Sequence, residues 1–157
     1  MSKKRPFFHQ LDSNTCGASC LKMICKYYGK SISYGVLVNK SHTSKVGSSL
    51  LNISDLAESI GFRTKGVQLS LEQLSDYEGL PCIAQFNVDH FIVIYEITKN
   101  NVVIADPAVG ILKYHKNDFA KHWCYMKKNE LDTGVLLLLE PYLHDKKSNT
   151  LNLYFDS

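Results

Sequence analysis

Four side chains in this sequence could together carry out nucleophilic chemistry on a carbonyl group: Cys16, His90, Asp106 and Gln10. Cys16 stands at the start of an apolar helical pattern, where unpaired backbone N–H groups and the positive end of the helix dipole favour a thiolate. A thiolate attacks a carbonyl carbon, but it needs a base, a group that orients the base, and donors for the developing oxyanion. These residue types therefore indicate acyl transfer by a cysteine nucleophile.

His90 is the best candidate for the base among the six histidines. It follows Val88-Asp89 and begins the apolar run FIVIYEI, so we expect it at the end of a strand and not in a core. Asp106 ends the next strand of a predicted antiparallel hairpin, which puts His90 and Asp106 at the same edge of the sheet. Strict register would not set them directly opposite, and we expect the turn at Pro107 to leave Asp106 free of the ladder.

Two further residues bear on this site. Asp89 is nearer to His90 in sequence than Asp106 is, but neighbours on a strand point to opposite faces, which favours Asp106 as the orienting group. Gln10 lies just upstream of Cys16 and could aim a side-chain N–H at the same carbonyl oxygen as the Cys16 backbone N–H. These two donors would form an oxyanion hole.

Each of these residues also has a purely structural interpretation. A cysteine at a helix start more often belongs to the core, and a single histidine in a strand is more often a satisfied polar group. Asp106-Pro107 is by itself a common turn former. Their joint arrangement favours catalysis, but the bare triad fits an amidase or a transglutaminase as well as a peptidase.

The remaining cysteines and histidines do not indicate a metal site. Cys20 and Cys25 continue the helix that begins at Cys16, Cys82 falls in a predicted strand, and Cys124 follows the only tryptophan. The cysteine spacing matches neither a zinc pair nor an iron–sulfur site, and the other histidines form no ligand pair. We therefore expect no metal and no cofactor.

Length and composition predict one globular domain. The chain has 157 residues, 45% of them hydrophobic and 21% charged, which is enough for a single core. A net charge of +3 is too small to indicate a nucleic-acid partner. No apolar segment approaches the ~20 residues that span a bilayer, and the basic start lacks the apolar region of a signal peptide. Five unevenly spaced cysteines then fit reduced thiols in a cytoplasmic setting.

The first half of the chain is predicted to be mainly helical. Apolar residues recur at helical spacing from Ala18, and Gly29 should end this helix. Ser31-Ile32-Ser33 is expected to cap a short helix that carries residues 36–38, and the polar stretch 39–49 is expected to be a loop. We expect a third helix over 50–60, a short strand over 62–69, and a short helix opened by the capping box Ser70-x-x-Gln73.

Beyond Pro81 the pattern is typical of strands. β-branched and aromatic runs predict strands over 82–86, 91–97 and 102–105, and Lys99-Asn100-Asn101 should join the last two as a hairpin. A further strand is expected over 111–115, a helix over 117–123, and a buried strand over 135–139. Helices followed by antiparallel strands form an α+β pattern.

Three segments, QLDSNTCGASCLKMICKYYG, DHFIVIYEI and ADPAVG, resemble the bacteriocin-processing peptidase domain, cysteine peptidase family 39. The resemblance spans about residues 5–141 and implies a papain-like α+β fold with N-terminal helices packed on a C-terminal antiparallel sheet. It implies that Cys16 is the nucleophile, His90 the base and Asp106 the orienting residue, with Gln10 in the oxyanion hole. The implied function is cleavage of a leader from precursor peptides after a Gly-Gly site. A domain that docks the leader without cutting it is the alternative.

Such domains usually lie at the N-terminus of ABC transporters that export peptides with double-glycine leaders. The resemblance therefore implies a peptidase domain over 1–141 and a linker over 142–157 that leads towards a transmembrane region. The expected partners are a precursor peptide with a double-glycine leader and the transmembrane and nucleotide-binding domains of an ABC transporter in the same full-length chain. The expected location is the cytoplasmic side of the cell membrane, with this fragment soluble on its own.

One residue departs from the family pattern. Thr15 stands where the family commonly has Asp, directly before the nucleophile. We expect this position to act on the loop or on the helix end, where Thr15 can still serve as a cap. Some relatives have lost the cysteine and only hold the substrate, but Cys16, His90 and Asp106 are all present here.

Overall fold

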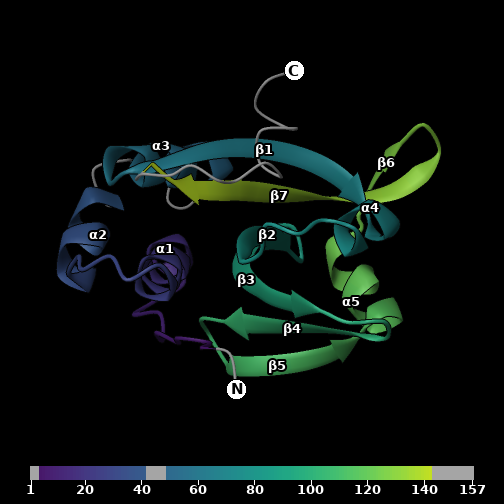
Figure 1. Cartoon of the computed structure of the whole chain (residues 1–157), viewed down its shortest axis with the longest axis horizontal. Helices are drawn as coiled ribbons and strands as arrows, with labels where there is room; N and C mark the ends of the chain where they lie inside the picture. Colours follow the sequence, from purple (N-terminus) through teal and green to yellow (C-terminus); the bar gives the residue numbers. More distant parts are fainter. Residues whose placement is uncertain (1–3, 42–48, 143–157) are drawn as a thin grey trace.

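The centre of the fold is a twisted seven-stranded sheet (Figure 1). The structure is a computed structural model, and it describes residues 4–41 and 49–142. The strands are β1 (Phe62–Ser70), β2 (Cys82–Phe86), β3 (His90–Ile97), β4 (Asn101–Asp106), β5 (Gly110–His115), β6 (Met126–Lys128) and β7 (Leu131–Pro141). They follow the order β1-β7-β2-β3-β4-β5, with β6 paired to β7, and all of these pairs are antiparallel.

Helices cover both faces of this sheet (Figure 1). They are α1 (Cys16–Tyr27), α2 (Tyr34–Ser41), α3 (Leu50–Ser59), α4 (Leu71–Ser75) and α5 (Lys116–Trp123). The first three share one hydrophobic cluster with the sheet, and α4 and α5 share another on the opposite face. None of these helices, within the ranges that the structure describes, is long and apolar enough to cross a membrane.

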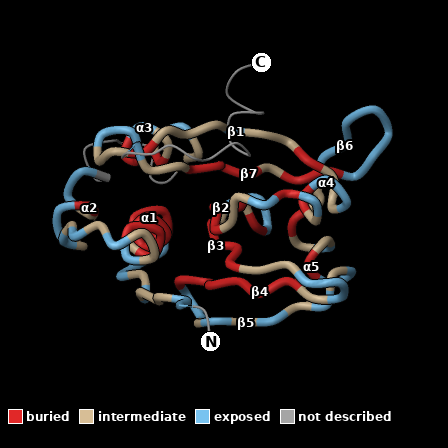
Figure 2. The backbone as a smooth tube through the Cα atoms, in the orientation of Figure 1, coloured by how far each residue is buried: buried red, intermediate tan, exposed pale blue. Residues whose placement is uncertain are grey.

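The central strands bury side chains on both faces. In β3, Phe91 and Val93 belong to the cluster beneath α1, whereas Ile92 and Ile94 belong to the cluster beneath α5. Residues 136–139 of β7 alternate in the same way. This two-sided burial, shown in red in Figure 2, explains why these strands are unbroken apolar runs instead of alternating ones.

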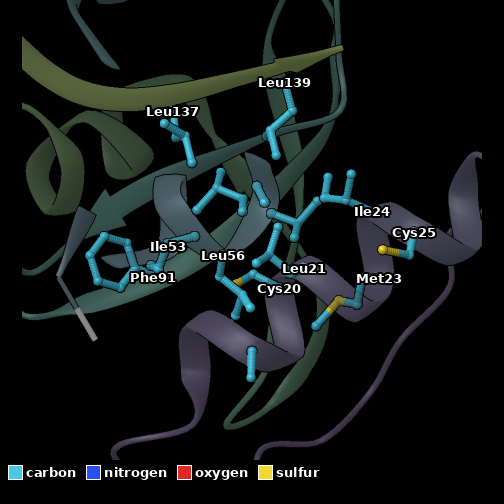
Figure 3. Close-up of a cluster of buried hydrophobic side chains, with 14 of the residues drawn as sticks. Cys20, Leu21, Met23, Ile24, Cys25, Ile53, Leu56, Phe91, Leu137 and Leu139 are labelled. Carbon is cyan, nitrogen blue, oxygen red and sulfur yellow. The ribbon is translucent and has the colours of Figure 1, made fainter. Parts of the chain in front are cut away.

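The most deeply buried helix is α1, the helix that begins with Cys16. Its residues Cys20, Leu21 and Ile24 are 0% exposed and pack between the sheet and α3 (Figure 3). The helix ends before Gly29, which adopts a positive φ of 75°, and the following backbone N–H of Lys30 donates to the Cys25 carbonyl at 2.8 Å. This packing fixes α1 against the sheet and so determines where Cys16 lies.

The α+β architecture predicted from the sequence is confirmed, and most elements lie where they were expected. The capping box is present, with Ser70 and Gln73 exchanging both hydrogen bonds. The structure adds that β1 is part of the sheet, beside β7, and that α4 and α5 cover the second face.

Two expectations about connections need correction. Residues 39–41 were expected in a loop but belong to α2, and the rest of that loop from 42 to 48 lies outside the described residues. Residues 126–128 and 131–133 form a β6–β7 hairpin that the sequence did not predict, since its mainly exposed and charged residues carry no apolar pattern. The linker expected over 142–157 lies outside the described residues, apart from Tyr142.

Candidate active site

The start of β3 and the end of β4 bring His90 and Asp106 together at one edge of the sheet. His90 Nε2 lies 2.7 Å from Asp106 Oδ1. Val93 pairs with Ala105, so the register sets His90 diagonal to Asp106, which is within reach of long side chains. As expected, Asp106 lies beyond the last pair of the β3–β4 ladder, Val93 with Ala105, but it is not free of the sheet, because it pairs with Gly110 of β5. The side chains, and not an irregular backbone, make the contact.

His90 and Asp106 each stabilise the charged form of the other. The pKa of His90 is raised to about 9. The hydrogen bond to Asp106 contributes most, a hydrogen bond with the Cys16 side chain adds to it, and burial opposes both. Burial raises the pKa of Asp106, but the hydrogen bonds from His90 and from the Ala108 backbone outweigh it, so that this pKa is lowered overall. At neutral pH the pair is therefore an imidazolium and a carboxylate. Since Nε2 is bound to Asp106, Nδ1 is the ring nitrogen left to face Cys16.

The turn between β4 and β5 holds two of the predicted site residues at once. Asp106 Oδ1 accepts the Ala108 backbone N–H at 2.9 Å, and this bond holds the carboxylate that also binds His90. The Pro107 carbonyl accepts the backbone N–H of Gln10, also at 2.9 Å. One turn thus positions both the orienting carboxylate and the glutamine.

The segment before Gln10 is tied to the far end of β3. The Tyr95 hydroxyl donates to the Pro6 carbonyl at 2.5 Å, and Arg5 forms an ion pair with Glu96. The buried Oε1 atom of Gln10 accepts no hydrogen bond from the described residues. The side-chain oxygen of Gln10 is therefore not used in any hydrogen bond within the described part of the chain.

Thr15 closes the loop between Gln10 and Cys16. Its buried hydroxyl accepts the N–H groups of Leu11 and Asp12, at 2.9 and 3.1 Å, and donates to the Asp12 carbonyl at 3.1 Å. Two acceptor positions and one donor are all that a hydroxyl has, so its capacity is used up. Of the two roles expected for this position, action on the loop is confirmed. The helix cap is wrong, because the Thr15 side chain makes no capping hydrogen bond to α1.

Sequence reasoning left open whether Thr15 acts on the loop or on the helix end, and it did not find the part played by the Pro107 carbonyl. The stretch Asp12-Ser13-Asn14 has the composition of a turn, and Asp12 Oδ1 accepts the Asn14 backbone N–H at 2.8 Å. No sequence pattern, however, links Gln10 with Pro107, because the contact joins segments far apart in the chain.

Cys16 is the first residue of α1 and is only 1% exposed. Burial raises the pKa of each of the other four thiols, to about 11 for Cys25 and Cys124 and well above the ordinary thiol value for Cys20 and Cys82. Those four are protonated at neutral pH, and Cys16 is the thiol that has an imidazolium beside it. Among the residues that the structure describes, no three histidine, cysteine or acidic side chains gather as a metal site would require.

Comparisons with known proteins found a matching family model and similar sequences. The model of the peptidase C39 family matches residues 4–130. The chain is 32% identical over 139 residues to the colicin V secretion/processing ATP-binding protein CvaB of Escherichia coli, and 35% identical over 139 residues to the probable microcin-H47 secretion/processing protein MchF of the same species. Each alignment covers 88% of this chain but only 18% of the relative, so the chain spans less than a fifth of their length.

Two solved structures share the fold. One is a double glycine motif protease from an AMS/PCAT transporter in complex with its leader peptide, with a TM-score of 0.76 and 30% identity, covering 88% of this chain and 93% of that one. The other is the peptidase domain of Streptococcus ComA, with a TM-score of 0.74 and 27% identity, covering 88% of this chain and 99% of that one. The papain-like fold expected from the sequence is thereby confirmed.

Proposed function

Because the chain belongs to the peptidase C39 family of cysteine peptidases, we propose that it cleaves the leader from precursor peptides directly after a Gly-Gly site. The observation that carries the proposal is the hydrogen-bonded pair of His90 and Asp106, 2.7 Å apart, with Cys16 beside the imidazole. A domain that only docks a leader has no use for an imidazolium next to a thiol. A cysteine peptidase needs that arrangement.

In the proposed mechanism, the Cys16 thiolate attacks the carbonyl carbon of the second glycine. The electron pair of the carbonyl moves onto its oxygen, which accepts hydrogen bonds from the Cys16 backbone N–H and the Gln10 side chain. The carbon–nitrogen bond then breaks, and the His90 imidazolium gives its proton to the departing amine. This leaves the leader bound to Cys16 as a thioester.

Water completes the reaction. Neutral His90 takes a proton from the water, whose oxygen attacks the thioester carbonyl, and the carbon–sulfur bond breaks to release the leader as a carboxylic acid. Asp106 keeps the imidazole oriented through both steps and stabilises its positive charge. The turn at Pro107 keeps Gln10 in position for each oxyanion.

The burial of Cys16 offers a physical reason for glycine at the cleavage site. With the nucleophile only 1% exposed, access to its sulfur is narrow. A passage that admits a peptide backbone but no Cβ selects two consecutive glycines by excluding larger residues.

The relatives also bear on the setting of this reaction. CvaB and MchF are secretion/processing ATP-binding proteins, and this chain corresponds to a small part of each. We therefore propose that the peptidase works beside the transmembrane and nucleotide-binding domains of an ABC transporter, on the cytoplasmic side of the membrane. Cleavage would then be coupled to export of the processed peptide.

A cleavage assay tests the proposal. Two model leader peptides, one with Gly-Gly and one with Gly-Val before the scissile bond, are incubated under reducing conditions with the wild type and with Cys16→Ala, and mass spectrometry locates the cut. We expect cleavage after Gly-Gly alone and none by the variant. Equal leader binding by both proteins without any cleavage would instead identify a docking domain. Amide hydrolysis or transfer on unrelated glutamine substrates would identify another acyl-transfer enzyme.

A further inference from the structure

The turn that leads into His90 has an unusual backbone. Residues 87–89 connect β2 to β3, and Asn87 and Val88 adopt positive φ angles of 51° and 75°. Asparagine tolerates this left-handed region, but a β-branched residue such as valine rarely enters it. Val88 keeps that conformation only if the surroundings impose it.

Contacts from α5 hold the turn of residues 87–89 at Asn87. The Asn87 backbone N–H donates to the carbonyl of His122 at 2.8 Å, and His122 Nδ1 lies 2.8 Å from Asn87 Oδ1. Because a carbonyl oxygen can only accept, Nδ1 carries the hydrogen in this bond. One residue of α5 thus binds both the backbone and the side chain of Asn87. On the other side, the Gln85 side-chain amide donates to the Val88 carbonyl.

The His122 ring is itself held between two aromatic side chains. It stacks on Phe86, with ring centroids 5.1 Å apart and an interplanar angle of 26°, and meets Tyr114 of β5 at 5.6 Å. Phe86 is 2% exposed and pairs with His90 across the β2–β3 ladder. The contacts of His122 therefore reach the strand residue opposite His90 as well as the turn before it.

This arrangement matters because His90 must meet Asp106 and Cys16 together. The turn closes on the pair Phe86 and His90, so it sets both the register of β3 and the direction in which His90 leaves the turn. A shift of one residue in the register would send the imidazole to the opposite face of the sheet.

We propose that His122 is a positioning residue for His90: by binding Asn87, it holds the left-handed turn that aims the His90 imidazole at Cys16. This assignment of a part in the reaction rests on the proposed peptidase function. The positioning role does not depend on which substrate is bound, because His122 acts through Asn87. In the contacts that the structure describes, His122 touches neither Cys16 nor Asp106.

Two substitutions at this position separate the hydrogen bond from the ring contacts. His122→Phe keeps an aromatic ring against Phe86 but cannot donate to Asn87, whereas His122→Asn carries an N–H close to the place of Nδ1 but no ring. We expect His122→Phe to lower kcat roughly 10- to 100-fold, as a small misplacement of a catalytic group does, and to leave KM within about twofold. His122→Asn should retain most of kcat. Equal activity of His122→Phe and wild type would overturn the proposal.

A second variant distinguishes positioning from general loss of stability. Val88→Gly removes the cost of the left-handed turn, so the turn no longer needs to be imposed by His122. We therefore expect the double variant Val88→Gly, His122→Phe to recover kcat to within about threefold of wild type. The single variant His122→Phe should stay roughly 10- to 100-fold below wild type. A double variant that recovers its melting temperature but not its kcat would contradict the proposal.

An activity-independent readout keeps this inference apart from the peptidase assignment. NMR titration of the His90 ring reports whether it remains bound to Asp106, and we expect the pKa of His90 to fall from about 9 towards 6.5 in His122→Phe. A wild type that cuts no leader peptide, together with this fall, would defeat the proposed function and leave the positioning role standing. An unchanged titration in His122→Phe would defeat the positioning role, whatever the peptide assay gives.

Discussion

His90 and Asp106 are hydrogen-bonded at 2.7 Å across two strands in which they are diagonal neighbours. Asp106 stays within the β4–β5 ladder through its pairing with Gly110, and its carboxylate is also held by the Ala108 backbone N–H. The orienting group is therefore held by regular backbone, whereas the imidazole is placed by the turn that precedes His90. This is why the turn before His90 and the loop before Cys16 are decisive for the site.

The charge of Asp106 should control the titration of His90. In Asp106→Asn we expect the pKa of His90 to fall from about 9 towards 6.5, because the carboxylate that stabilises the imidazolium is gone. Peptide cleavage should fall about 100-fold or more, since the imidazole also loses its orientation. NMR titration and kcat/KM measure the two effects. Asp89→Asn is the matched control, because Asp89 is exposed and adjacent to His90 in sequence, and it should leave both values unchanged.

The same pair should make stability depend on pH in a defined way. His90 has a raised pKa in the folded state, so its contribution is complete below about 6.5 and is lost as pH rises through about 9. Asp106 has a lowered pKa, so its contribution is present above the ordinary aspartate pKa of 3.8 and is lost as pH falls through the pKa of the folded state. The Tm advantage of wild type over Asp106→Asn should therefore be greatest between about pH 4 and 6.5. An advantage that grows from pH 7 to pH 10 would contradict this.

Thr15 offers a test of the loop between Gln10 and Cys16. Thr15→Val keeps the shape but leaves the N–H groups of Leu11 and Asp12 without their acceptor. We expect a loss of roughly 1–3 kcal/mol in the free energy of unfolding, measured by urea denaturation, together with lower kcat. Thr15→Ser keeps the hydroxyl and should retain both properties. Equal stability of the valine and serine variants would show that the hydroxyl does not close the loop.

Gly134 tests the packing of the second face of the sheet. A Cβ at Gly134 would overlap the ring of Trp123, which is 0% exposed and cannot swing out to solvent. We expect Gly134→Ala to lower the free energy of unfolding by roughly 1–3 kcal/mol, as overpacking does. Gly66→Ala is the control, because its Cβ would meet only a Leu50 methyl at 3.4 Å. Similar melting curves for both variants would contradict the close packing of Trp123.

Much of this fold could be predicted from the sequence because the signals are local. The capping box of Ser70 and the glycine after α1 each act within a few residues, and the antiparallel hairpin puts His90 and Asp106 at one edge whatever the detailed register. One detail of this edge could not be predicted. Pro107 indicates a turn, but no local signal shows that Asp106 pairs with Gly110 of β5 before the turn begins.

Other features depend on tertiary contacts that leave no local pattern. Valine disfavours a positive φ, so the sequence at Val88 does not indicate a left-handed turn. The hydrogen bond between His122 and Asn87 beside this turn joins two distant segments of the chain. Thr15 resembles a helix cap in sequence, yet its hydroxyl bonds back to the loop. In both places the tertiary structure overrides the local preference.

Covalent capture of the nucleophile tests the central claim most directly. A Gly-Gly leader that carries a chloromethyl ketone in place of the scissile amide is incubated with the protein, and peptide mapping by mass spectrometry locates the thioether formed as chloride leaves. We expect a single adduct on Cys16, none in Cys16→Ala, and little with a Gly-Val probe. Adducts on any of the other four cysteines, or cleavage of the natural peptide without capture at Cys16, would contradict the account.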